Sequence, residues 1–532
     1  MRHDSIIQLS RRSLLMLSAA AGYLVNDRAA AAEPTTLTVA VVPEPQGLIG
    51  TLAVSAPAVT ISTSIFDGLV TYDDQGRPVP SLAESWEQSA DHRTITFHLR
   101  RDVTWHDGQP FTSADVRYTL LQVMKTVHPR GNAYLAALTD VQTPDDHTAI
   151  FVLSRPSPLI WTVLGSDEIQ ILPRHLYENT NPLTNPWNAK PVGTGAFVFK
   201  SWARGDSVLV ERNPRYWQKG RPVFDRVRFR FIPDAGVRVA ALETGEVQYV
   251  PLSPVPLSDV TRLRGEKDLV VETRGWDFSA PMLFTDFNMR RPKFQDVRVR
   301  QAIAHAIDRQ KLADTVWYGL ADPATGPVPS YQKQSYTPDT QQYAFDPDQA
   351  TKLLDAAGLR PDSDGIRLRI DHAPMPYGDD YLRTGEFIRQ SLKHVGIDVT
   401  LRSYDLPTFL RVVFTDGDFD TFNSFYAAFS DPQIGVQRRF WSKAIKKGTP
   451  WGNGSGYANA EMDQIIEAIQ TEGDPAARTQ LIHRMQQKAQ NDLPSLTLLE
   501  LKFFRVFSSR LGGIDVGPDG GYQSLAPVGY RA

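Results

Sequence analysis

The stretch Leu283–Arg309 reads LFTDFNMRRPKFQDVRVRQAIAHAIDR, and its pattern predicts a strand that leads into a helix facing a core. Its first part, Leu283–Asn288, is an apolar and aromatic run of strand length. Arg290-Arg291-Pro292 ends this run, because proline lacks a backbone donor and disfavours the helical region at the residue before it. Asp296 is placed to cap the helix that follows. The apolar stripe of this helix recurs at helical spacing and comprises Val299, Ala302, Ile303, Ala306 and Ile307.

Two further features of this stretch concern its charged residues. Asp296 and Arg300 lie four residues apart in the order that favours an ion pair on a helix. Asp308 predicts the start of a second short helix, which we expect to end at Gly319.

The composition limits the class of protein. The chain has 532 residues, of which 41% are hydrophobic and 22% charged, so it can form two or more domains with large cores. Its 57 basic and 60 acidic residues do not fit a strongly basic nucleic-acid binder, and we expect no nucleic-acid partner. It contains no cysteine, which excludes disulfides, thiolate metal sites and cysteine nucleophiles.

The N-terminus has the pattern of an export signal. Arg11 and Arg12 directly precede the apolar run Leu14–Val25, which is too short to cross a membrane, and Ala29–Ala32 offers small residues for cleavage. The arginine pair favours twin-arginine export, and an ordinary Sec signal is the alternative. We therefore expect residues 1–32 to be removed near Ala32 and the mature chain to be exported.

The remaining chain alternates predicted strands and helices. Strands are expected at 37–42, 94–99, 227–232, 366–370, 397–401, 418–426 and 496–507. Helices are expected at 346–357 and 381–394, and after the capping residues Thr112, Asn459 and Asp474. The strand, helix and strand within residues 227–250 form a βαβ rhythm, which predicts an α/β lobe with a partly parallel sheet.

No catalytic or metal-binding constellation is apparent in the sequence. There is no His-Glu-x-x-His, and Ser455 between two glycines does not form a nucleophile elbow. Asp416-x-Asp418-x-Asp420 begins like a calcium loop, but Ala427 occupies the closing acidic position. Gly193-x-Gly195 lacks the lysine of a phosphate-binding loop and is better interpreted as a tight strand entry. We expect no catalytic activity, no cofactor and no metal site, and a secreted hydrolase is the alternative.

As a string, FN-x-RRP-x-F-x-DVRVRQAIAHAIDR resembles the signature of the family 5 extracellular solute-binding proteins, the peptide, nickel and opine receptors of ABC importers. Four other segments strengthen the resemblance. They are ISTSIFDGLV at 61–70, PSLAESW at 80–86, PVGTGAF at 191–197 and RNPRYW at 212–217. The resemblance extends over essentially the whole mature chain.

The resemblance implies an α/β, two-lobed periplasmic-binding-protein fold with a hinge and an extra small α+β domain beside lobe I. The expected boundaries are 1–32 for the signal, 33–74, 187–284 and 497–532 for a discontinuous lobe I, 75–186 for the small domain and 285–496 for lobe II. It also implies a periplasmic, monomeric protein. That protein would capture a peptide-like or opine-like solute in the cleft and deliver it to an ABC permease in the inner membrane.

Residues 421–441, TFNSFYAAFSDPQIGVQRRFW, resemble the family segment W-x-AD-x-x-DP, which contacts ligand. Asp431-Pro432 matches its end, Phe425 stands at the tryptophan, and Ala428 stands at the aspartate that pairs with the ligand's α-amino group in peptide-binding members. The resemblance implies that Phe425, Tyr426 and Trp441 line the cleft. It also implies a ligand without a free α-amino group there, such as an opine, a sugar conjugate or a blocked peptide. The alternative is that another acid, such as Asp405 or Glu44, supplies the anchor.

Overall fold

The computed structural model describes residues 35–53, 55–253, 255–514 and 516–531. The expected export signal, with Arg11, Arg12 and the cleavage site near Ala32, lies outside the described residues. None of the helices within these ranges combines the length and the apolar character that a membrane span requires.

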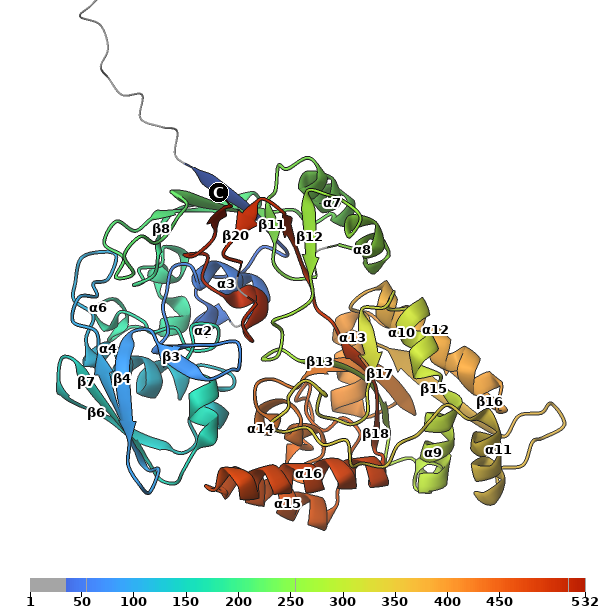
Figure 1. Cartoon of the computed structure of the whole chain (residues 1–532). Coiled ribbons are helices and arrows are strands. Elements are labelled where there is room, and N and C mark those ends of the chain that lie inside the picture. Colours follow the sequence, from blue (N-terminus) through green and yellow to red (C-terminus); the bar gives the residue numbers. More distant parts are fainter. Residues whose placement is uncertain (1–34, 54, 254, 515, 532) are drawn as a thin grey trace, which may run out of the picture. The chain divides into compact units, whose positions relative to one another are not determined.

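The first lobe is built on a seven-stranded sheet with the spatial order β12-β19-β11-β1-β10-β9-β8 (Figure 1). Its strands are β1 (Thr36–Val41), β8 (Phe197–Ala203), β9 (Ser207–Arg212), β10 (Arg226–Phe231), β11 (Tyr249–Val250), β12 (Leu269–Glu272) and β19 (Arg505–Ser508). The central strand β1 runs parallel to β10 and to β11, and helix α7 (Ala235–Glu243) connects those two strands. The predicted βαβ rhythm and partly parallel sheet are confirmed.

A small domain precedes β8 in the sequence and contains a four-stranded antiparallel sheet in the order β4-β5-β7-β6. Its strands are β4 (Ala83–Gln88), β5 (Thr94–Leu99), β6 (Leu138–Asp145) and β7 (Thr148–Leu153). The alternating strand β5 places Ile95, Phe97 and Leu99 in one core with Trp105 and Phe151. Helix α4 (Ser113–Tyr118) begins with the predicted capping box, in which the Asp115 carboxylate accepts from the Thr112 N–H at 2.9 Å.

The second lobe is built on a six-stranded sheet in the order β14-β18-β13-β17-β15-β16. Its strands are β13 (Pro281–Phe287), β14 (Ala321–Pro323), β15 (Leu368–Pro374), β16 (Ile397–Leu401), β17 (Thr421–Ala427) and β18 (Ser495–Leu501). The helices around it are α9 (Val297–Ala306), α11 (Pro347–Ala356), α12 (Asp379–Lys393), α15 (Ala460–Thr471) and α16 (Pro475–Asp492). Figure 1 shows these helices as separate groups around the sheet.

Every residue of β13 is buried, because helices pack on both faces of the second sheet. Leu283 and Phe287 belong to a core that includes α9, α11 and α12. Met282 and Phe284 belong to another core that includes α15 and α16. A strand covered on both sides is mostly apolar, as this one is apart from Thr285 and Asp286.

Shorter α-helices and two hairpins connect these elements. The helices are α2 (Gly50–Ala53), α3 (Ala56–Ser62), α5 (Gly131–Tyr134), α6 (Arg174–Tyr177), α8 (Leu257–Leu263), α10 (Arg309–Thr315), α13 (Leu406–Arg411) and α14 (Pro432–Gly435). The hairpins pair β2 (Val70–Tyr72) with β3 (Pro78–Pro80) and β20 (Leu511–Gly512) with β21 (Gly529–Tyr530).

The predicted caps form, but the predicted Asp296–Arg300 ion pair is wrong. Asp296 accepts from the Arg298 N–H and pairs with the Arg298 guanidinium at 2.6 Å. Arg300 is buried and donates to the carbonyls of Asp492 and Leu493 at 2.6 and 3.1 Å. Arg300 therefore satisfies carbonyls at the end of α16, because a buried guanidinium needs acceptors that the solvent-facing Asp296 does not provide.

Two expected boundaries and one expected strand need correction. All of β13 and β18 hydrogen-bond within the second sheet, so boundaries at 284/285 and 496/497 divide strands. The single strand expected over 496–507 is two strands, β18 in the second sheet and β19 in the first. Residues 502–504 cross between the sheets, as residues 273–280 do between β12 and β13. The boundaries after residues 32, 74 and 186 stay predictions.

Three of the segments that carried the family resemblance meet at Asp67, which is buried. Its carboxylate accepts hydrogen bonds from the Thr194 hydroxyl at 2.9 Å, the Tyr216 hydroxyl at 3.1 Å and the Trp217 indole at 3.2 Å. Burial raises the pKa of Asp67, and the bonds from Trp217, Thr194 and Tyr216 oppose that rise. These segments therefore stabilise the first lobe.

The glycines of residues 191–197 serve the same packing. A Cβ at Gly193 would lie 1.9 Å from the Ile65 carbonyl oxygen, so only glycine permits this approach of two backbones. The two glycines are therefore needed because the backbone of residues 193–195 packs directly against the backbone of Ile65 as the chain enters β8.

Candidate functional site: the cleft between the lobes

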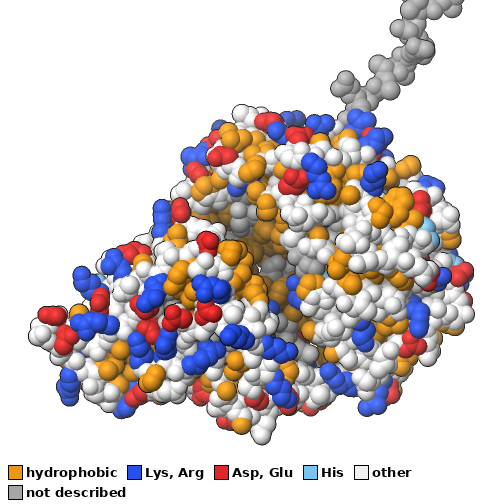
Figure 2. All heavy atoms as spheres, turned by 180° about the vertical axis from the view of Figure 1, so that it is seen from behind, with side chains coloured by type: hydrophobic (Ala, Val, Ile, Leu, Met, Phe, Trp, Pro, Cys, Tyr) orange, Lys and Arg blue, Asp and Glu red, His pale blue; other side chains and the backbone are white. Residues whose placement is uncertain are grey.

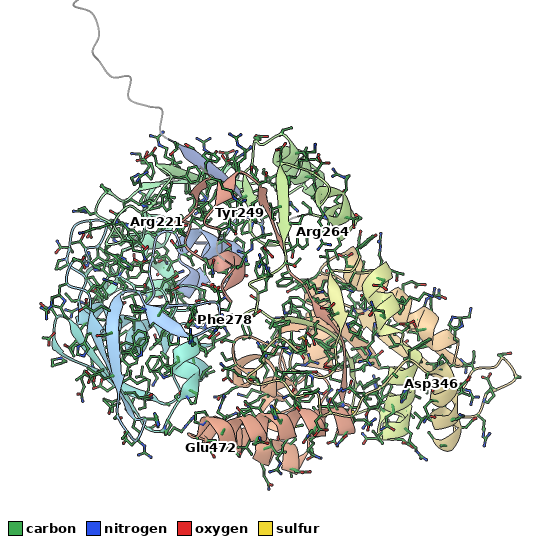
Figure 3. All side chains as sticks on the ribbon, in the orientation of Figure 1. Arg221, Tyr249, Arg264, Phe278, Asp346 and Glu472 are labelled. Atoms are coloured by element: carbon green, nitrogen blue, oxygen red, sulfur yellow. The ribbon has the colours of Figure 1, made fainter. Side chains whose placement is uncertain are left out.

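A cavity of about 310 Å³ lies where the first lobe, the small domain and the second lobe meet. Its aromatic wall residues are Tyr134, Phe278, Phe425, Phe429, Phe503 and Tyr522, and its charged wall residues are Arg130, Asp167, Glu168 and Asp519. Figure 2 shows a hollow in the surface with hydrophobic side chains on its walls, and Figure 3 labels Phe278 beside the small domain. The mixture of aromatic area with a few charged groups is typical of a small-molecule site.

The elements that hold these side chains come from distant parts of the sequence. Phe425 lies on β17 of the second lobe, while Asp167 and Glu168 lie between β7 and β8, beside residues of the small domain's core. Phe278 and Phe503 lie on the two segments that cross between the sheets. The aromatic rings of Phe425 and Phe503 are 6.4 Å apart, centre to centre. Both lobes and both crossings therefore contribute to one wall.

The cleft continues beyond Phe278. A neighbouring cavity of about 440 Å³ shares Thr162, Phe278 and Ser430 with the first, and extends to Tyr331 and Lys333. Phe278 also packs edge-on against Tyr72 of β2, with ring centres 4.8 Å apart. The two cavities together offer room for a ligand longer than a single amino acid.

One charged pair in the cavity is internally satisfied. The Arg130 guanidinium donates to both carboxylate oxygens of Glu168, at 2.9 and 3.2 Å. Arg130 also lies 5.5 Å from the ring centres of Tyr134 and Phe429. Both bonds come from one guanidinium nitrogen, and they hold Arg130 against the cavity wall.

Two further acids, Asp167 and Asp519, line the cavity. Burial, followed by the charges of Asp519 and Glu168, raises the pKa of Asp167 well above its ordinary value. Asp519 accepts a hydrogen bond from the Gln523 amide at 2.6 Å. The cavity therefore contains three carboxyl groups and one guanidinium among the described residues.

Of the six residues expected to bind ligand, Phe425 lies in the cavity wall. Its neighbour Tyr426 does not. Tyr426 is buried in the core of the second lobe, packs against Phe284 and donates its hydroxyl to the Pro327 carbonyl at 2.5 Å. Successive residues of a strand point to opposite faces, so Phe425 and Ala427 face the cavity while Tyr426 faces the core.

Ala428 is fully buried in the same core as Tyr426 and does not line the cavity. Its N–H donates to the Ala280 carbonyl at 2.9 Å. A side chain in this position does not reach a ligand in the cavity. The inference that the ligand lacks a free amino group because Ala428 lacks a carboxylate stays a prediction, and acids from other segments line the cavity.

The other three expected residues lie outside the cavity. The Trp441 indole donates to Glu467 at 3.3 Å, and Lys443 covers its ring. Glu44 accepts from the Trp202 indole at 2.9 Å and from the Gly205 N–H at 3.0 Å. Asp405 caps α13 by accepting from the Thr408 N–H at 2.9 Å, and hydrogen bonds from Thr408 lower its pKa. Each of these groups has a local structural partner, which the sequence pattern did not reveal.

Some of the missed residues carried a signal in the sequence. Asp167-Glu168 interrupts an otherwise apolar stretch between Leu164 and Ile169, and both flanking residues are buried. Charged residues are seldom buried unless they have a partner or a function, so an acidic pair between buried residues is a candidate for a functional site. Asp519, Phe278 and Phe503 carried no such signal, since only the fold brings them beside Phe425.

Two groups that the sequence raised as chemical candidates lie elsewhere. Ser455 is buried, and its hydroxyl donates to the Asn453 amide oxygen at 2.9 Å. Asp420 pairs with Lys293 at 2.8 Å, at the end of the second sheet. Within the ranges that the structure describes, no three His, Asp or Glu side chains are arranged to hold a metal ion.

Comparisons with known proteins give a consistent result. A family model described as "Bacterial extracellular solute-binding proteins, family 5 Middle" matches residues 77–448 of this chain. A Brucella ovis protein whose name describes a peptide-binding protein of an ABC transporter is 30% identical over 461 residues. That alignment covers 84% of this chain and 83% of the relative.

Solved structures show the same two-lobed fold. A dipeptide-binding protein from Pseudoalteromonas sp. SM9913 in complex with Met-Leu aligns with a TM-score of 0.76 at 23% identity, over 93% of this chain and 100% of that one. A binding protein from Agrobacterium tumefaciens R10 in complex with agropinic acid aligns with a TM-score of 0.72 at 24% identity, over 93% and 99%.

Proposed function

Because the chain belongs to the family 5 bacterial extracellular solute-binding proteins, we propose that it captures a peptide-like or opine-like solute in the cleft around Phe425 and delivers it to an ABC permease. The Brucella relative supports a peptide-like solute. The Agrobacterium complex adds an opine bound by the same fold.

The observation that carries this proposal is the cavity whose walls come from both lobes. A solute that touches Phe425 on the second lobe and Asp167 on the other side stabilises the arrangement in which the two walls are close. The two crossings at 273–280 and 502–504 are the segments about which such lobes move. A permease can then distinguish the loaded protein from the empty one.

The proposal includes the route of the protein to its site of action. Membership of an extracellular family of ABC importers supports a periplasmic location. We place the cleavage near Ala32 and assign export to the twin-arginine route, on the strength of Arg11 and Arg12. We also propose that the mature chain acts as a monomer.

Native mass spectrometry of the protein purified from the periplasm of its own host tests the capture of a solute. We expect a small molecule that is released intact on unfolding and that rebinds when added back. Phe425→Ala should reduce its retention, because the ring contributes stacking area. Phe345→Ala, which changes a phenylalanine that is 51% exposed outside the cavity, is the matched control. Release of a chemically altered molecule would instead support a hydrolase.

A further inference from the structure

A separate cavity of about 280 Å³ lies within the second lobe and shares no wall residue with the cleft. One wall is a helical turn, Val412–Asp416, which follows α13. The opposite wall is the loop 444–454, which precedes α15, and the Gly448 N–H joins the two by donating to the Phe414 carbonyl at 2.8 Å. Arg290 enters from the segment after β13. Three segments of one lobe therefore enclose this cavity, which we call the basic pocket.

The charge of the basic pocket is mostly positive. Arg290, Lys446 and Lys447 line it, and within the described ranges none of the three forms an ion pair. The acid in the wall, Asp416, is paired with Arg411. Burial lowers the pKa of Arg290, because the partly desolvated guanidinium has no neighbouring carboxylate. An anion that enters the pocket would therefore meet three cations whose charge no acid of the protein neutralises.

The guanidinium of Arg290 is held in place by the backbone around it. Its Nη1 donates to the Asn288 side-chain oxygen at 3.0 Å and to the Gly454 carbonyl at 3.2 Å. Gly456 packs against the same group, since a Cβ there would lie 2.6 Å from the Arg290 Cζ. The two bonds use one of the three guanidinium nitrogens, and a planar guanidinium binds carboxylates and phosphates through more than one nitrogen.

The rest of the basic pocket is apolar or carries hydroxyls. Phe414 packs edge-on against Trp451, with ring centres 5.6 Å apart, and lines the pocket together with Ile445, which is 37% exposed. The hydroxyl side chains Thr415 and Thr449 also line it. Hydroxyls donate to anionic oxygens, whereas exposed apolar side chains favour a ligand with an apolar part.

We propose that the basic pocket is a second binding site, which takes a small organic anion with a carboxylate or phosphate group. Arg290, Lys446 and Lys447 bind the anionic oxygens. Phe414 and Ile445 pack against the apolar part of the same molecule. The site lies outside the cleft between the lobes, so it is independent of the solute that the cleft captures.

Five compounds that differ in charge and apolar area test the assignment. They are phenyl phosphate, 3-phenylpropionate, inorganic phosphate, phenethylamine and sodium chloride, each titrated into the mature protein at one fixed ionic strength and followed by calorimetry and thermal shift. We expect phenyl phosphate or 3-phenylpropionate to bind, and the stronger of the two identifies the anionic group. Inorganic phosphate should bind more weakly, and phenethylamine and chloride should have no effect.

Variants then locate the bound anion. Arg290→Gln should weaken its binding about tenfold, through loss of a charge-assisted hydrogen bond. The double variant Lys446→Gln, Lys447→Gln should weaken it about threefold or more, and both lysines are exposed, so this variant keeps the fold even if Arg290→Gln does not. Lys352→Gln, which removes an exposed lysine from α11, is the matched control.

The cleft is excluded as the place of binding by Phe425→Ala, in which anion affinity should equal that of the wild type. Anion binding that is lost in Phe425→Ala and kept in the double lysine variant would overturn the assignment. So would equal effects of phenethylamine or chloride, or a wild-type protein that binds neither organic anion. Retention of the native solute reports on the cleft alone, so either proposal can fail while the other holds.

Discussion

Asp167 is held beside two other acids, so its effect on the stability of the ligand-free protein depends on pH. Its pKa is raised in the folded state by burial and by the charges of Asp519 and Glu168. An acid with a raised pKa binds its proton more tightly in the folded than in the unfolded chain. Its contribution to stability is therefore present at low pH, and is lost as the pH rises from the unfolded pKa of about 3.9 through the raised folded value.

We expect Asp167→Asn to remove this loss. The unfolding free energy of the wild type should fall relative to that of the variant as the pH rises above about 4, with a slope of at most about 1.4 kcal/mol per pH unit. Urea denaturation at a series of pH values measures the difference, and Asp348→Asn controls for net charge. A difference that stays constant with pH would contradict the raised pKa. The titratable or charged groups around Asp167 are Tyr72, Arg130, Glu168, Asp519 and Tyr522.

Asp67 stabilises the first lobe through three hydrogen bonds that its buried carboxylate accepts. Asp67→Ala leaves the hydroxyls of Thr194 and Tyr216 and the indole of Trp217 without their acceptor. We expect a loss of about 3 kcal/mol or more in the free energy of unfolding, and a smaller loss for Asp67→Asn, which keeps one carbonyl oxygen. Urea denaturation of both variants measures this. Wild-type stability in Asp67→Ala would show that the three segments are held together by other contacts.

At the scale of the element, β17 separates stability from binding by the alternation of its side chains. Tyr426→Ala removes a buried ring and its hydrogen bond to Pro327, and we expect it to destabilise the protein by about 3–5 kcal/mol. Phe425→Ala removes a half-buried ring from the cavity wall, so the larger effect should be on solute affinity. Paired calorimetry and denaturation of the two variants test this division. A Tyr426→Ala protein with native stability and weakened binding would reverse it.

Ala428→Asp extends the same argument by one more residue. The new carboxylate would enter the apolar core that contains Tyr426. We therefore expect a loss of several kcal/mol in stability and no gain in affinity for free-amine peptides. Denaturation and titration with Ala-Phe measure the two effects, and Ala427→Asp on the cavity face is the control. A folded Ala428→Asp protein with tighter amine binding would restore the family's anchor to this position.

At the scale of the whole molecule, the chain passes between the two lobes at residues 273–280 and 502–504. The proposed export signal in residues 1–32 gives a prediction of its own. If the twin-arginine translocase reads Arg11 and Arg12, the double variant Arg11→Lys, Arg12→Lys should accumulate as unprocessed precursor in the cytoplasm. Cell fractionation followed by mass measurement of the N-terminus detects this. A disrupted apolar run between Leu14 and Val25 is a control that blocks both routes. Normal periplasmic levels of the double variant would favour Sec export.

The sequence by itself determined the local structure of this protein and the family to which it belongs. The caps at Asp296, Asp308, Asp346, Asn459 and Asp474 all form as predicted, each accepting a backbone N–H at the start of its helix. Caps and apolar periods depend on residues within a few positions of each other, so they are visible in one dimension. The buried β13 was visible for the same reason.

The tertiary structure alone decided which residues line the candidate site. Phe425 was found from its motif, but the face on which Tyr426 and Ala428 lie depended on the register of β17 against β13. Asp167, Phe278, Phe503 and Asp519 come together because two sheets share chain crossings, and no local pattern encodes that meeting. The single strand predicted at 496–507 likewise concealed a change of sheet, since a strand's partners are set by hydrogen bonds between distant segments.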